Sequence, residues 1–142
     1  MRWLLALLGM APAVTWALDF RSVAEPAVMY DAPSRQSSQR FVIARLTPVE
    51  LVVSIEGWAK VRDAAGDIAW VERHVLSDKR TVIVTAARAE VRQQADPASA
   101  LAFEAEKDVV LDFVEAGPAG WVKVRHRDGQ SGFVRVTQVW GS

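Results

Sequence analysis

Two short runs of the sequence place an aromatic ring beside positive charges. In each run a tryptophan is followed by basic residues two and four positions later. The six residues are Trp58, Lys60 and Arg62 in the first run and Trp121, Lys123 and Arg125 in the second. Alternate side chains of an extended strand share one face, so each tryptophan should lie beside two cations. Such a face suits a sugar ring or a peptide that also carries carboxylates. The alternative is that each tryptophan only covers the end of a small fold, where Lys and Arg stems shield it.

Residues for the common catalytic and metal-binding arrangements are scarce. The chain has no cysteine, which excludes disulfides, thiolate nucleophiles and cysteine zinc sites. Its two histidines, His74 and His126, are far apart in the sequence. Ser131, His126 and Asp128 lie within one predicted turn, and three members of a catalytic triad cannot converge from one tight turn. We therefore predict no catalytic residue, no metal site and no cofactor.

The overall charge gives no preference for a polyanion. The chain carries 17 basic and 17 acidic residues and is 51% apolar, which is the composition of a globular protein. A nucleic-acid partner is therefore not expected.

The runs belong to an internal repeat. Residues 57–71 align without a gap with residues 120–134, at an offset of 63. Identical pairs are Gly57/Gly120, Trp58/Trp121, Lys60/Lys123, Val61/Val124, Arg62/Arg125, Gly66/Gly129 and Val71/Val134.

Each repeat reads as a set of short strands. Residues 58–62 and 68–72 alternate between apolar and polar side chains around a turn that contains Gly66, which predicts a β-hairpin. The second copy repeats this pattern around Gly129, and β-rich runs precede both hairpins at residues 48–55 and 109–115. Residues 81–85 are β-branched throughout, so we expect a strand there that holds the two copies close together. Helix formers compete at residues 98–107, but alternation favours a strand.

The N-terminal segment is typical of an export signal. Arg2 precedes an uncharged apolar run from Trp3 to Val14, and small residues follow. The apolar run is too short to span a bilayer, which argues against an uncleaved anchor. We expect cleavage after Ala17, with Ala13 as the alternative, and no membrane insertion after cleavage. The expected division is a signal peptide at 1–17 and two modules at 18–78 and 79–142.

The repeated Gly-Trp-x-Lys-Val hairpin, followed by Gly and then a small residue, an aromatic and Val, resembles the bacterial SH3-like (SH3b) family. The resemblance implies an all-β fold of two tandem small SH3-like β-barrels, and a binding or targeting function in the cell envelope. Copy one resembles the peptide groove of the eukaryotic relatives at Tyr30 and Trp58, but Glu72 stands where the groove proline would be. Copy two keeps only Trp121, with Arg135 at the place of Glu72.

These observations predict a periplasmic or secreted, non-enzymatic binding protein. Its expected partner is a cell-wall glycan or peptide (peptidoglycan) or an envelope protein. The ligand-binding residues would be Tyr30, Trp58, Lys60, Arg62, Trp121, Lys123 and Arg125, and copy one is the better candidate if only one copy binds. The alternative is an adaptor whose two barrels pack together and present a protein-interaction surface, and burial of both tryptophans at the contact between the copies would favour it.

Overall fold

The computed structural model describes residues 18–142, so the predicted signal peptide and its cleavage site lie outside the described residues. The first seven strands form one antiparallel sheet in the order β3-β2-β6-β5-β4-β1-β7. They are β1 (Phe20–Val23), β2 (Ala27–Tyr30), β3 (Gln39–Ile43), β4 (Pro48–Ile55), β5 (Trp58–Arg62), β6 (Ile68–Glu72) and β7 (Leu76–Ser77). A short 3-10 turn, η1 (Arg73–Val75), precedes β7.

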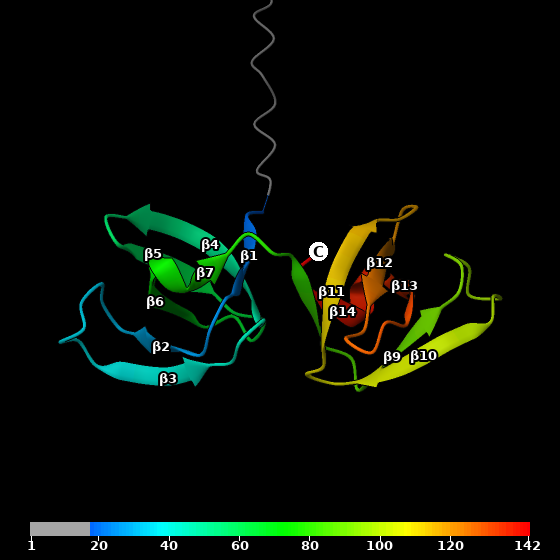
Figure 1. Ribbon diagram of the computed structural model, residues 1–142, viewed down its shortest axis with the longest axis horizontal. Helices are drawn as coiled ribbons and strands as arrows, with labels where there is room; N and C mark the ends of the chain where they lie inside the picture. The colour runs from blue at the N-terminus through cyan, green and yellow to red at the C-terminus, as the bar shows by residue number, and fades with distance from the viewer. Residues whose placement is uncertain (1–17) are drawn as a thin grey trace, which may run out of the picture.

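The next seven strands repeat this arrangement as a second sheet, in the order β10-β9-β13-β12-β11-β8-β14. They are β8 (Thr81–Val84), β9 (Arg88–Arg92), β10 (Leu101–Glu106), β11 (Val110–Ala116), β12 (Trp121–Arg125), β13 (Ser131–Arg135) and β14 (Val139–Trp140), with η2 (Val136–Gln138) before β14. Adding seven to each strand label of the first sheet gives the order of the second. The predicted all-β tandem is therefore present, and the ambiguous segment around Phe103 is strand (Figure 1).

Each sheet encloses its own small core. The alternation read from the sequence sets the inner face, because Ala59 and Val61 of β5 are fully buried while their neighbours are partly exposed. Val122 and Val124 of β12 are likewise buried, next to the more exposed Lys123 and Arg125. The cores consist mainly of valine and alanine, and the clusters around Val61 and Val124 share no residue.

The two copies lie side by side (Figure 1). Residues from both copies contact each other between them. The buried hydroxyl of Thr81, on β8, donates a hydrogen bond of 2.7 Å to the carbonyl of Leu46 in copy one. The ring of Phe20 packs against the ring of Trp140 from the last strand. The predicted strand at residues 81–85 thus links the copies directly. Within residues 18–142, no helix has the length and apolar character needed to cross a bilayer.

Candidate functional site

A groove on copy one is built around the first repeat tryptophan. Trp58 begins β5 and is half-buried, and Tyr30 ends β2 and is almost wholly buried. Their rings meet edge to face with centroids 5.5 Å apart and an interplanar angle of 83°. This geometry is favourable for an aromatic pair, so the two predicted aromatic residues do meet.

The groove consists of two adjoining hollows of about 450 Å³ and about 290 Å³. The first hollow exposes Trp58 beside Pro33, and the second runs along Tyr30 and Val28. Arg35, Glu72 and His74 line both hollows. These three residues therefore lie at the boundary between the hollows.

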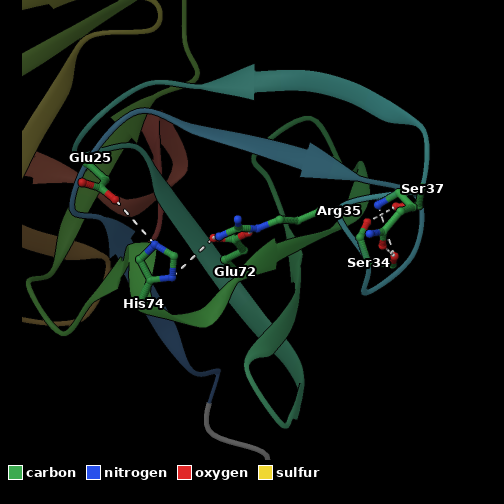
Figure 2. Close-up of polar contacts among 7 residues, drawn as sticks. Glu25, Ser34, Arg35, Ser37, Glu72 and His74 are labelled. Carbon is green, nitrogen blue, oxygen red and sulfur yellow. Dashed lines mark hydrogen bonds and ion pairs between the residues drawn. The ribbon is translucent and has the colours of Figure 1, made fainter.

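An ion pair between Arg35 and Glu72 lies at that boundary (Figure 2). Arg35 donates from Nε to Glu72 Oε1 and from Nη2 to Glu72 Oε2, the latter at 3.1 Å. His74 Nδ1 lies 3.4 Å from Glu72 Oε2, and its Nε2 lies 3.8 Å from Glu25 Oε1. The hydrogen bond from Arg35 lowers the pKa of Glu72 below its ordinary value, with a smaller electrostatic contribution from His74. The boundary is thus a charged bridge, with Glu72 ionised at neutral pH.

The loop that carries Arg35 has a fixed shape. Ser37 Oγ donates to the carbonyls of Ser34 and Ala32 at 2.6 and 3.0 Å, and Ser34 Oγ accepts from the backbone amide of Gln36 at 3.2 Å. Such side-chain bonds to nearby backbone groups stabilise a turn. The Arg35 side chain, 71% exposed, is therefore projected from an ordered turn toward β6.

The corresponding place on copy two is closed. The guanidinium carbon of Arg135 lies 4.7 Å from the centroid of the Trp121 ring, and Trp121 is only 9% exposed. The hollow that remains has about 40 Å³. The strand register is the same in both hairpins, so the difference follows from the residue opposite the tryptophan, which is Glu72 for Trp58 and Arg135 for Trp121. An arginine stacks on an aromatic face, and a glutamate does not.

The remaining predicted residues do not line the groove. Lys60 Nζ lies 5.9 Å from the centroid of the Trp70 ring, its partner across the hairpin, and Arg62 forms a 3.0 Å ion pair with Glu50. Lys123 and Arg125 share the outer face of β12. These four residues follow the predicted face of their strands, but none lines the hollow beside its tryptophan.

The groove also contains residues that the sequence analysis missed. The sequence patterns single out neither Arg35 nor Glu25, and they give His74 no binding role. Arg35 comes from a loop whose position no strand pattern specifies. The signal available in the sequence was Glu72, which stands where SH3 relatives have the groove proline. A carboxylate at that position indicates a cation nearby. Within residues 18–142, no group of three or more potential ligands is placed to hold a metal ion.

Comparison with known proteins identifies the repeats. The family model of the bacterial SH3 domain matches twice, at residues 23–78 and 85–141. No curated protein sequence matches the chain.

Solved structures match the chain at low sequence identity. NlpC2 from Trichomonas vaginalis is 12% identical, with a TM-score of 0.41, and the match covers 90% of this chain and 49% of that one. NlpC1 from the same organism is 11% identical, with a TM-score of 0.41, over 93% and 49% of the two chains. An NlpC/P60 family protein from Bacillus cereus is 12% identical, with a TM-score of 0.38, over 84% and 55%. The chain spans about half the length of each of these structures.

Proposed function

The chain belongs to the bacterial SH3 domain family, whose members are typically binding modules, and from this premise we propose that its first copy binds a component of the cell wall. The proposed ligand is peptidoglycan, which offers sugar rings, peptide bonds and carboxylates. Its proposed binding place is the groove of Trp58, Tyr30 and Arg35. We assign no ligand to the corresponding position of the second copy, where the hollow has only about 40 Å³.

One observation carries this proposal. The same position of the repeat is an open hollow of about 450 Å³ beside Trp58 in copy one and about 40 Å³ beside Trp121 in copy two. A ligand needs a concave surface with an accessible apolar group and a few polar groups, and of these two hollows the one beside Trp58 provides all three. Stacking on the Trp58 ring would supply contact area, and Arg35 could exchange Glu72 for a carboxylate of the ligand.

Sedimentation with purified peptidoglycan tests the proposal. The wild-type protein should pellet with the wall material. Trp58→Ala should weaken binding by at least about tenfold, as expected for a central aromatic contact, whereas Trp121→Ala should change it by less than about twofold. The two variants make the same substitution at the same repeat position, so each controls for the other.

A second variant distinguishes loss of binding from loss of folding. Arg35 is mostly exposed, so the Arg35→Ala variant should stay folded and unfold cooperatively, with only a small loss of stability, while binding is weakened. Failure of the wild-type protein to pellet would remove peptidoglycan as the ligand. Equal losses in Trp58→Ala and Trp121→Ala would remove the groove as the site.

We also propose that the chain is exported to the periplasm or beyond the cell, which the wall ligand requires. Cell fractionation and N-terminal sequencing test this location. The expected mature N-terminus is Leu18. A full-length chain in the cytoplasm would contradict it.

A protein partner is the second candidate, and one feature favours it. The end of β4 exposes Val52, Val53 and Ile55, each between 41% and 42%, and Ile55 pairs with Trp58 across the hairpin. An exposed apolar strand end beside a groove suits an envelope protein partner. The tryptophans themselves do not join the copies, because Trp58 contacts Tyr30 and Trp121 contacts Arg135, each within its own copy.

A further inference from the structure

A cleft of about 390 Å³ lies between the two copies, away from the groove of Trp58. Its lining includes Arg45 and Leu46 from the turn between β3 and β4 of copy one. Copy two contributes Asp108, beside β11, and His126 and Arg127 from the turn between β12 and β13. None of these residues lines the groove.

The walls of the cleft are held by equivalent turns of the two copies. The amide of Leu46 donates to the carbonyl of Val23 at 2.7 Å, and the amide of Asp108 donates to the carbonyl of Val84 at 2.8 Å. Leu46 and Asp108 both have left-handed backbones, with φ of 70° and 72°. A leucine in this conformation persists only where its surroundings hold it. The bond from Thr81 to the Leu46 carbonyl ties this turn to copy two, so the cleft is formed in advance of any ligand.

Two arginines from different copies line the cleft without charged partners. Neither Arg45 nor Arg127 takes part in an ion pair within residues 18–142, and both are exposed. Arg45 uses only its Nε, in a 3.3 Å hydrogen bond to the carbonyl of Ala24. Most of the hydrogen-bond donors of both guanidinium groups therefore remain available to a ligand.

Asp108 and His126 do not cancel the positive charge of the two arginines in the cleft. Counted over the lining residues alone, which do not include Asp128, Arg45 and Arg127 against Asp108 give a formal charge of 2 − 1 = +1 with His126 neutral. His126 Nδ1 accepts a 3.2 Å hydrogen bond from the amide of Asp128, and the Asp128 carboxylate lies 3.1 Å away. The other ring nitrogen, Nε2, is left for a ligand.

The tandem contains a built-in comparison. A second hollow of about 340 Å³ adjoins this cleft, shares Ile83 and Asp108 with it, and also has Ala64 of copy one and Lys107 of copy two in its lining. At the repeat offset of 63, Ala64 occupies the position of Arg127. The pair of arginines is therefore a property of the first cleft alone and not of the way the copies pack.

We propose that this cleft binds a small oxyanion, a ligand with phosphate or carboxylate groups, between Arg45 of one copy and Arg127 of the other. Guanidinium groups recognise both kinds of group through paired hydrogen bonds. The site needs both copies, which gives the fixed tandem a function that a single barrel could not have. It does not rest on the function proposed for the groove, because the two share no residue.

Isothermal titration calorimetry tests this site at low salt, where screening is weak. The protein is titrated with inorganic pyrophosphate and, in a separate arm, with succinate, so that phosphate and carboxylate sources are distinguished. We expect one ligand per chain in at least one arm. Arg45→Ala and Arg127→Ala should each weaken that binding by at least about tenfold, the loss of one charge-assisted contact.

Two matched variants serve as controls. Lys107→Ala removes the same charge from the second hollow, and Trp58→Ala alters the groove; both should bind the anion within about twofold of wild type. No binding of either anion by the wild-type protein would overturn the proposal. A loss in Lys107→Ala equal to that in Arg45→Ala would also overturn it, because overall charge would then explain the binding.

Discussion

The ring of Phe20 lies edge to face against the ring of Trp140, with centroids 5.1 Å apart, although 120 residues separate them in the chain. Phe20 belongs to the first strand and Trp140 to the last. The guanidinium carbon of Arg80, between the copies, lies 5.4 Å from the Phe20 ring and 4.7 Å from the ring of Phe113. Arg80 also donates a 2.9 Å hydrogen bond to the carbonyl of Gly141. These contacts connect the first strand of copy one to the last strand of copy two.

Trp140→Ala should therefore uncouple the copies. We expect the wild-type protein to unfold in urea in one transition. The variant should unfold in two steps, with a free energy of unfolding lower by about 2 to 3 kcal/mol. Circular dichroism measures the unfolding of both proteins. Leu18→Ala, at an exposed position, should stay within about 0.5 kcal/mol of wild type. An unchanged single transition in Trp140→Ala would show that the aromatic pair does not hold the copies together.

Gly132→Ala should destabilise copy two, even though copy one has Ala69 at the same repeat position. A Cβ at Gly132 would lie 2.5 Å from the carbonyl oxygen of Arg92 and 2.8 Å from Val91 Cγ1, so β13 would have to move away from β9. We expect a loss of about 1 to 3 kcal/mol by thermal unfolding. If chain entropy dominated instead, the variant would gain about 0.4 to 1 kcal/mol, and the close approach of the strands would be refuted.

Thr81→Val should loosen the turn that lines the inter-copy cleft. The substitution keeps the shape of the side chain but removes the donor to the carbonyl of Leu46, at a cost of about 1 to 2 kcal/mol. Amide hydrogen exchange at Leu46 and Thr47 should become faster. Thr85→Val, at an exposed position after β8, is the control and should leave exchange at these amides unchanged.

The charged bridge across the groove should open in acid. Because Arg35 holds the pKa of Glu72 below 4.5, the ionised pair stabilises the fold above that pH and is lost as the pH falls through the folded pKa. A carbon-13 NMR titration of the Glu72 carboxyl should give a midpoint below 4.5, and Arg35→Ala should raise it. Arg40→Ala, which removes a cation that does not contact Glu72, should leave the midpoint unchanged. A Glu72 midpoint that Arg35→Ala fails to move would contradict the bridge.

Much of the fold could be predicted from the sequence, because its information is local and repeated. Alternation around Trp58 and Trp121 predicts both hairpins and their buried faces, and the offset of 63 predicts that the second sheet repeats the first. Strand β10 was predicted correctly because Ala105 points inward at the alternating position.

Whether each groove is open or closed is harder to predict, because it depends on the residue that faces the tryptophan across the hairpin. Glu72 and Arg135 were recognised as departures from the SH3 pattern, yet only the register shows that Arg135 faces Trp121 and stacks on it. Arg35 reaches Glu72 from a loop, and loop conformation does not follow from periodicity. The contact of Phe20 with Trp140 joins the two ends of the tandem, and no local pattern carries that information.

Nuclear magnetic resonance with soluble peptidoglycan fragments tests the central claim most directly. The indole N–H signals of Trp58 and Trp121 report separately on the open and the closed groove in a single titration of the nitrogen-15-labelled protein. We predict saturable shifts at Trp58 and at the backbone amide of Arg35, with Trp121 unmoved. Shifts at Trp121 without shifts at Trp58, or no shift at either residue, would contradict the assignment of ligand binding to the first copy.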